Sequence, residues 1–334
     1  MGYSVAILNN IRLNMSEEYQ SRIPEATQTN IAQIGQAFET YTTEFNAFRD
    51  VLIHKIGRTK IEQKMFENKL SRFKGGLVSP HDMEEIFIEM AKAEGSYDPE
   101  GKNPLGRREL PDIKVIYHRQ NRQDKYVISI GDIDFLKVFR SEATLDAYIG
   151  GLINSVYSAD EYDEWLAMKN LLATYKNKEG ECGYFDYEVT ETTDKKEFAK
   201  SFVKTLRKAV QDFSFADTQY NVAGVKTWSN ASELVLLVHK DVLVEVDVEQ
   251  LASAFNRSDT DMKVVPTIIS MDDFGSLADT YGLLLDKDWF RVYDTLMHME
   301  TQRNADGLFT NYFLHHHQML SASTFKNAGR FKKV

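Results

Sequence analysis

Cysteine is almost absent from this sequence. The single cysteine, Cys182, cannot form a disulfide within the chain, which indicates folding in a reducing compartment. Basic residues are also in deficit, because 40 Lys and Arg face 50 Asp and Glu and leave a formal net charge of −10. A protein that grips duplex nucleic acid by neutralising phosphates normally carries a basic excess. The composition therefore argues against a dedicated nucleic-acid-binding protein.

Long hydrophobic runs are missing too. Among the longest is LVLLV at 234–238, far short of the ~20 apolar residues that a membrane helix needs. Residues 1–20 lack a basic segment followed by a long apolar run, so we expect no signal peptide. Hydrophobic residues nevertheless make up 43% of the chain and aromatic residues 12%, enough to build folded cores. We expect a soluble protein of about two domains, at ~150 residues each, with no membrane partner.

Catalytic signatures are also lacking: the sequence has no P-loop, no G-x-G-x-x-G after a strand, no H-E-x-x-H and no G-x-S-x-G. Three consecutive histidines in NYFLHHHQML raise the question of a metal site. In a strand only His315 and His317 share a face, at about 7 Å from each other. Two ligands do not make a structural zinc site. We predict no enzyme and no cofactor, with His315 and His317 as the remaining metal candidates.

Proline is concentrated in the first third of the chain, which holds five of the six prolines. The stretch EGSYDPEGKNPLGRRELP (94–111) combines three of them with three glycines and predicts an extended linker. Ahead of this linker, a helix is expected to begin at Ser79, with Pro80 in its first turn. Its buried side chains would extend as far as Met90.

A helix with an apolar seam is predicted ahead of the linker. Its apolar residues are spaced alternately three and four positions apart, as in a heptad repeat: Ile31, Ile34, Phe38, Tyr41, Phe45, Phe48 and Leu52. One interpretation is an ordinary helix packed on its own domain. The other is a helix that buries this seam against another subunit, which makes the seven residues candidates for an interface.

After the linker, IKVIYHRQNRQDKYVISIGD (113–132) predicts a β-hairpin, because two strand-like runs flank a polar segment. The segment carries Arg119, Arg122 and Lys125. A lone two-stranded ribbon is marginal in water, so it must pack on its own domain or lie on a neighbour. The three basic residues are therefore further candidates for a subunit interface.

The remaining chain alternates helices and strands. Residues 141–177 predict two helices in series, the second starting at a capping box of Ser158 and Glu161. A strand at 184–189 and a basic amphipathic helix at 194–212 follow. The outer face of that helix carries six cations, which indicate a solvated surface or contact with nucleic acid or an acidic partner. LVLLVHKD at 234–241 is apolar on both faces, as in a central strand.

From about residue 105 onward, this succession resembles the major capsid proteins of tailed bacteriophages, which have the Hong Kong 97-type fold. The hairpin is similar to the extended E-loop, and SADEYDEWLAMKNLLATY (158–175) is similar to the long spine helix of the peripheral domain. The segments 228–256 and 282–295 resemble the axial domain. The histidine stretch, NYFLHHHQMLSASTFKNAGRF, resembles the long strand that returns to the peripheral domain. The order of these segments is similar to that in the capsid proteins of small podoviruses.

The resemblance implies an α+β fold and a domain plan. Residues 1–110 would form an N-terminal helical region and arm, and 111–140 the E-loop. Residues 141–215 with 301–334 would form the peripheral domain, and 216–300 the axial domain.

It also implies a function: a major capsid protein that assembles with itself, as hexamers and pentamers, into the icosahedral shell around the phage DNA. Expected partners are scaffolding, portal and head-decoration proteins, with non-specific proximity to DNA. The protein would assemble in the bacterial cytoplasm and reside in the virion.

Three alternatives stay open at this point. An encapsulin-like nanocompartment would share the fold class. A metal-dependent enzyme would use His315 and His317 together with distant acids. A nucleic-acid-binding protein would use the basic helix at 194–212.

Overall fold

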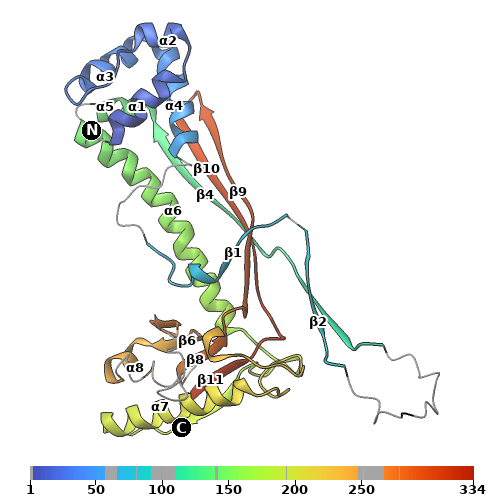
Figure 1. Ribbon diagram of the computed structural model, residues 1–334. Coiled ribbons are helices and arrows are strands. Elements are labelled where there is room, and N and C mark those ends of the chain that lie inside the picture. Colours follow the sequence, from blue (N-terminus) through green and yellow to red (C-terminus); the bar gives the residue numbers. More distant parts are fainter. Residues whose placement is uncertain are drawn as a thin grey trace. The chain divides into compact units, whose positions relative to one another are not determined.

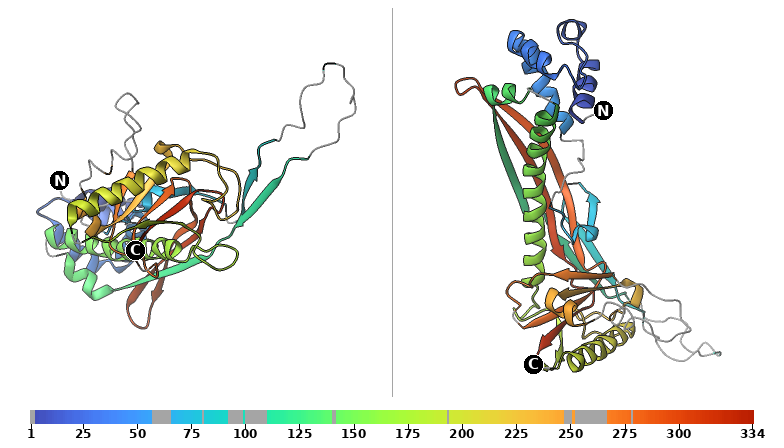
Figure 2. Two further views of the ribbon diagram at one scale, coloured as in Figure 1. Left: turned by 90° about the horizontal axis from the view of Figure 1, so that it is seen from below. Right: turned by 90° about the vertical axis from the view of Figure 1, so that its left-hand side faces the viewer.

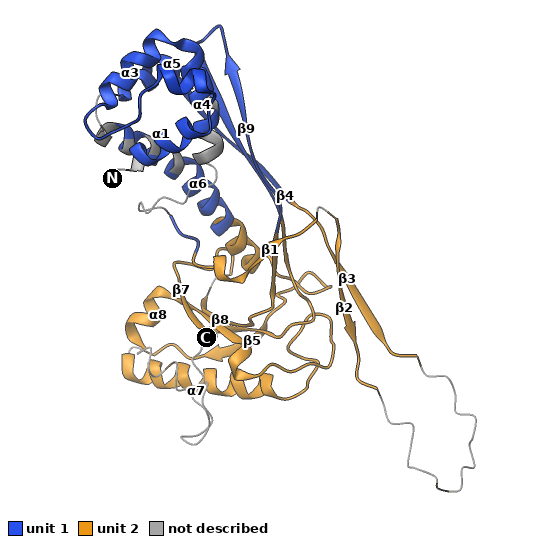
Figure 3. Cartoon of the chain, turned by 45° about the horizontal axis from the view of Figure 1, so that its top comes forward, with its two compact units in different colours: residues 1–68, 122–165, 294–318 blue, residues 69–121, 166–293, 319–334 orange. Residues whose placement is uncertain are grey.

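The computed structural model describes residues 3–56, 66–79, 81–91, 99, 110–139, 142–192, 194–246, 251, 267–277 and 279–334. The chain divides into two compact units (Figure 3). Unit 1 comprises residues 1–68, 122–165 and 294–318, and unit 2 comprises residues 69–121, 166–293 and 319–334. No helix within the described ranges is long and apolar enough to cross a membrane.

Unit 1 opens with four helices, α1 (Tyr3–Leu13), α2 (Glu17–Arg22), α3 (Ile31–Thr40) and α4 (Thr42–Ile56), which lie together with α5 (Asp132–Val138) (Figure 1). Their shared core contains a cluster of aromatic rings. Phe38 stacks on Phe48 with ring centroids 4.8 Å apart, and Phe139 meets Phe38 edge-on at 5.3 Å. Aromatic packing of this kind adds about 0.5–1.5 kcal/mol per pair to the burial of apolar area.

The seam predicted at 31–52 is interrupted at one residue. Tyr41 leaves the helical conformation (φ −112°, ψ 78°) and separates α3 from α4. Its neighbours Thr40, Thr42 and Thr43 are β-branched and weaken a helix locally. The two helices can therefore fold back on each other and bury their apolar residues within one unit.

The long strands β4 (Arg122–Gly131), β9 (Phe290–Asn304) and β10 (Phe309–Ala322) belong to a four-stranded sheet of order β1-β9-β10-β4, with β1 spanning Lys74–Leu77 after the short 3-10 helix Ser71–Phe73. β4 and β10 run antiparallel, with His315 opposite Lys125. β10 alternates buried and partly exposed residues as the histidine stretch predicted, and His316 points to the buried side while His315 and His317 do not.

Helix α6 (Glu142–Ala173) is a single helix of 32 residues (Figure 2). The prediction of two helices in series is wrong, because neither the glycines at 150–151 nor Ser158 interrupts it. The hydroxyl of Ser158 accepts a hydrogen bond from the backbone N–H of Phe66 instead of capping a helix. Ser141 lies outside the described residues.

Unit 2 contains a mixed five-stranded sheet of order β5-β11-β8-β6-β7. Its strands are β5 (Phe185–Val189), β6 (Leu234–His239), β7 (Thr267–Met271), β8 (Thr280–Asp286) and β11 (Ala328–Lys333). The interior position of β6 confirms the prediction of a central strand. Two short helices, Ala231–Glu233 (3-10) and α8 (Lys240–Glu245), flank β6.

Helix α7 (Lys195–Ser214) packs against the sheet of unit 2 with the face that the sequence predicted. Phe202 contacts Phe331 of β11 at 5.2 Å between ring centroids, and Phe198 contacts Tyr281 of β8 at 5.0 Å. Asp194 caps the helix by accepting a hydrogen bond from the N–H of Lys196.

The sheet of unit 2 combines strands from segments that the domain plan lists separately. The plan assigns 184–189 and 328–333 to the peripheral domain and 234–239 to the axial domain, yet β5, β11 and β6 belong to one sheet. The pairing of distant segments decides this, and no local pattern encodes it. The linker at 94–111 lies outside the described residues, apart from Pro99, Leu110 and Pro111.

The region around the linker also pairs differently. β2 (Met83–Ile88) is a strand, so the helix predicted from Ser79 to Met90 is wrong. β3 (Ile113–His118) pairs antiparallel with β2 and not with β4, so the hairpin predicted at 113–132 is also wrong. Partly buried and exposed residues alternate along MEEIFI, as the two faces of a strand require. Residues between β2 and β3 therefore connect the two strands of one ribbon.

Gly282 offers a test of the sheet in unit 2. A Cβ atom there would lie 2.7 Å from the carbonyl oxygen of Leu237 in β6, so Gly282→Ala must push two central strands apart. We expect a loss of about 1–3 kcal/mol in the free energy of unfolding of the unassembled chain, measured by denaturant titration.

Gly151→Ala is the matched control. Gly151 lies within α6 and has no atom within 4 Å of the added methyl, so this variant should gain about 0.5–1 kcal/mol. Equal midpoints for the two variants would contradict the packing described here.

Candidate functional site

The β2–β3 ribbon of unit 2 has one apolar face open to solvent. Its outward side chains include three opposed pairs: Glu84 with Tyr117, Ile86 with Val115, and Ile88 with Ile113. The five apolar members are all exposed. A two-stranded ribbon has no second layer to cover such a face, and a contiguous exposed apolar patch marks an interaction surface.

The inner face of the ribbon is held by a partly buried carboxylate. Glu85 of β2 accepts hydrogen bonds from Arg291 of β9 at 2.7 Å, from Nε2 of His118 at 3.0 Å and from the Ser323 hydroxyl at 2.9 Å. Nδ1 of His118 lies 2.7 Å from the Ser321 hydroxyl. Burial alone would raise the pKa of Glu85, but the bonds from His118, Arg291 and Ser323 outweigh it and lower the pKa to about 2.

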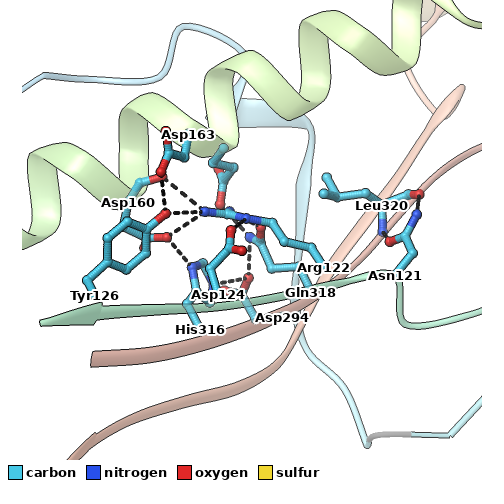
Figure 4. A network of polar contacts seen from close by, with 11 residues as sticks. Asn121, Arg122, Asp124, Tyr126, Asp160, Asp163, Asp294, His316, Gln318 and Leu320 are labelled. Carbon is cyan, nitrogen blue, oxygen red and sulfur yellow. Dashed lines mark hydrogen bonds and ion pairs between the residues drawn. The ribbon is translucent and has the colours of Figure 1, made fainter. Parts of the chain in front are cut away.

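A second polar network lies in unit 1, between α6 and the strands β4, β9 and β10 (Figure 4). His316 is at its centre and is 1% exposed. Its Nδ1 lies 2.7 Å from Asp160 of α6, and its Nε2 lies 2.9 Å from Asp294 of β9. Burial alone would lower the pKa of His316, but the bonds to Asp160 and Asp294 raise the pKa to about 9. His316 is therefore an imidazolium cation at neutral pH.

Arg122 extends this network from β4. It donates to Asp160 and to the hydroxyl of Tyr126, each at 2.9 Å, and also to the side chain of Gln318. Gln318 in turn donates to Asp294 at 2.8 Å and to Glu164. Two cations and three carboxylates are thus interleaved, so each buried charge has an opposite charge or a hydrogen-bond partner beside it.

The same network contains the group of described residues whose donor atoms could meet on one metal ion: Glu164, Asp294 and His316, within 4.8 Å of one another. Their donor atoms are already engaged by the imidazolium proton and the Gln318 amide. The arrangement is that of a structural hydrogen-bond network. The predicted metal candidates His315 and His317 point to the opposite side of β10 from His316.

The comparison with protein families decides what these features belong to. The family model described as Phi29-like phage major capsid protein matches residues 8–332. The chain belongs to this family.

Individual relatives agree with the family match. The major capsid protein of Bacillus phage PZA is 34% identical over 333 residues, covering 98% of this chain and 72% of that protein. The major capsid protein of Streptococcus phage Cp-1 is 27% identical over 344 residues, covering 97% of this chain and 93% of that protein.

Solved structures of phage capsids have a similar fold. A chain in the capsid of Staphylococcus phage Andhra superposes with a TM-score of 0.63 at 11% identity, over 83% of this chain and 88% of that one. A chain in the mature capsid of bacteriophage PhiM1 gives a TM-score of 0.52 at 10% identity, over 83% and 90%. The capsid protein therefore has the Hong Kong 97-type fold that the sequence resemblance implied, and it is a shell-forming structural protein of the virion.

The predicted interface residues of the seam at 31–52 differ in their exposure. Six of the seven seam residues lie in the capsid protein's own core at 0–4% exposure: Ile31, Ile34, Phe38, Phe45, Phe48 and Leu52. Unit 1 already covers these six side chains, which favours the interpretation of helices packed on their own domain. Tyr41 is 37% exposed and keeps the interface prediction open.

The three basic candidates do not share a hairpin tip. Arg122 is the buried residue just described, at 7% exposure. Arg119 is exposed and pairs with Asp82 at 3.0 Å, and Lys125 is exposed with its ammonium 5.6 Å from the Phe313 ring centroid. Arg119 and Lys125 stay interface predictions.

Sequence reasoning missed Glu85, His118 and Arg291 because their segments are far apart along the chain. Two weaker signals were available. The alternation in β2 places Glu85 opposite the apolar face of Ile86 and Ile88, and the alternation in β10 sets His316 apart from its two neighbours.

Replacement of Arg122 tests the network in unit 1. Arg122→Gln leaves Asp160 buried with one cationic partner fewer, and we expect a loss of about 3–5 kcal/mol in unfolding free energy by denaturant titration. Arg119→Gln is the control, since this exposed ion pair contributes about 0–1 kcal/mol. Losses of equal size would show that Arg122 is not a buried anchor.

The pKa of His316 predicts a pH dependence of stability. Its pKa rises from about 6.5 in the unfolded chain to about 9 in the fold. The stabilisation is complete below about pH 6.5 and is lost as pH rises through about 9. It amounts to roughly 3 kcal/mol.

Unfolding free energies measured from pH 6 to pH 9.5 should show this decline. The His316→Gln variant should be less stable and lack that part of the decline, while His315→Gln should keep it. A decline of the same size in His316→Gln would rule out His316 as its source.

Proposed function

We propose that this capsid protein builds its shell through the apolar face of the β2–β3 ribbon, which lies on a neighbouring copy in the manner of an E-loop. The observation that supports this is the set of five exposed apolar side chains on a ribbon whose other face is anchored. No element among the described residues covers them, whereas a second copy can. The role is mechanical, and catalysis has no part in it.

The anchoring of the ribbon supports the same proposal. Arg291 and His118 hold Glu85 at the root, Phe87 contacts Phe325 at 5.5 Å, and Lys114 donates to the carbonyl of Ala223 at 3.2 Å. The ribbon is thereby joined firmly to unit 2. A rigid ribbon loses little conformational freedom when it docks, which favours association.

Within the shell, we assign the axial role around local symmetry axes to the five-stranded sheet and α7 of unit 2. The peripheral role goes to unit 1 with its part of α6. This assignment revises the predicted boundaries at 215 and 301, because β5, α7 and β11 pack with β6 and β8. Hexamers and pentamers of this subunit would tile the shell around the DNA.

Family membership supports the wider plan. Scaffolding, portal and head-decoration proteins would be the partners of assembly, which would take place in the bacterial cytoplasm. The encapsulin-like alternative has no support in the match to phage capsid proteins. The enzyme alternative draws no support from the acidic network, since His315 and His317 lie on the face of β10 opposite His316 and its acids.

Substitution on the apolar face of the ribbon tests the proposal. Val115→Thr combined with Ile86→Thr keeps two β-branched residues but removes apolar contact. At about 0.8 kcal/mol per buried CH₂, we expect the subunit concentration needed for shell formation to rise about tenfold or more, as measured by light scattering and electron microscopy.

Val244→Thr is the control, because Val244 is an exposed valine of α8 away from the ribbon. It should assemble like the unmodified protein. If the ribbon variant assembled at unchanged concentration while remaining folded, the ribbon would not be an assembly surface.

A further inference from the structure

Helix α7 carries a cationic surface that neither the fold nor the ribbon uses. Six basic and two acidic side chains lie in this 20-residue helix of a chain with net charge −10. All six cations are exposed: Lys195, Lys196, Lys200, Lys204, Arg207 and Lys208. The concentration of positive charge is therefore local, against an acidic background.

The arrangement of these cations is regular. At 100° per residue, all but Lys195 lie within an arc of about 120° opposite the buried face of Phe198, Phe202 and Leu206. Four of them recur at every fourth position, so they follow one another at about 6 Å along the helix. They are Lys196, Lys200, Lys204 and Lys208.

Intramolecular ion pairs do not account for the four lysines. Lys195 approaches Glu245 at 3.6 Å, whereas Lys196, Lys200, Lys204 and Lys208 form no salt bridge with another residue that the structure describes. Their charges are free to meet an external polyanion. The helix holds them on a rigid element, because its opposite face packs on the sheet of unit 2.

We propose that this surface of α7 contacts the backbone of the duplex DNA enclosed by the shell. The inference rests on the established capsid function and is independent of the proposed role of the ribbon. Duplex DNA presents a negative charge every ~1.7 Å along its axis, so a row of cations about 18 Å long meets several phosphates at once. Contact of this kind is independent of base sequence.

The rest of the subunit is acidic and repels DNA, so we expect one copy to bind the duplex weakly. Non-specific binding in the range of 10⁻⁴ to 10⁻⁶ M is typical at physiological salt. Many copies in one shell would still act together on one long DNA molecule. A weak, repeated contact holds the outer layer of DNA at the wall and lets it slide.

Binding of a 30-base-pair duplex to the full-length unassembled chain, followed by fluorescence anisotropy between about 50 and 200 mM salt, tests the proposal. Four phosphate contacts predict a slope of about −4 for log K against log salt concentration. The double variant Lys200→Gln with Lys204→Gln should reduce this slope to about −2. Gln has nearly the same helix propensity as Lys, so α7 should remain folded.

The matched control is Lys178→Gln with Lys226→Gln, which removes the same charge from exposed positions outside α7. It should keep the slope of the unmodified protein. The variant Lys200→Arg with Lys204→Arg should also keep it, which separates loss of charge from loss of structure. Equal slopes for the α7 and control variants would overturn the proposal.

Two further results would also overturn it. A reconstruction of assembled shells by electron cryomicroscopy should place α7 on the inner wall, and its location on the outer wall would contradict contact with DNA. If the chain bound polyglutamate but did not bind the duplex at the same salt concentration, an acidic protein would be the occupant of this surface.

Discussion

The partly buried Glu85 carboxylate determines which face of the β2–β3 ribbon packs on its own subunit and which face is left exposed. Arg291, His118 and Ser323 converge on it from three other segments of unit 2, so one face of the ribbon is committed to the subunit. Strand alternation then leaves Ile86, Ile88 and their partners in β3 on the opposite face. The described part of the chain leaves this apolar face exposed, which is the basis for the proposed contact with a second copy.

Unit 1 also contains a network of polar side chains that fixes how its elements pack. A helix and three strands meet around side chains that would be costly to bury singly, and the cost is offset by interleaving charges of opposite sign. His316 contributes as a cation because Asp160 and Asp294 hold its proton. Arg122 contributes a permanent cation to the same acids. The result is a polar layer with defined geometry, which fixes how β4, β9 and β10 lie against α6 within that unit.

The two functional surfaces differ in the physics of association. The exposed face of the ribbon is apolar, and its contacts would depend on the removal of water from aliphatic side chains, which releases no counterions. The face of α7 is cationic, and its contacts would depend on counterion release. Separation of these two surfaces lets subunit–subunit and subunit–DNA contacts respond to different conditions. An acidic net charge for the rest of the chain keeps the second contact weak.

Local patterns in the sequence were sufficient for α7, β5 and β10, because each has a period of 3.6 or 2 and buries the face that the period predicts. For β6 the signal was a short run that is apolar on both faces, as in a central strand. The order and character of these segments also sufficed for the resemblance to tailed-phage capsid proteins. Tertiary structure decided everything that depends on partners distant in sequence. β3 pairs with β2 because the two strands together form one apolar outer face and an inner face that holds the polar contacts of Glu85. Arg122 is buried because Asp160 and Gln318 contact it from α6 and β10. The seam of α3 and α4 turns inward for the same reason: a helical period specifies which residues seek cover, but only the assembled core shows whether that cover comes from the same chain.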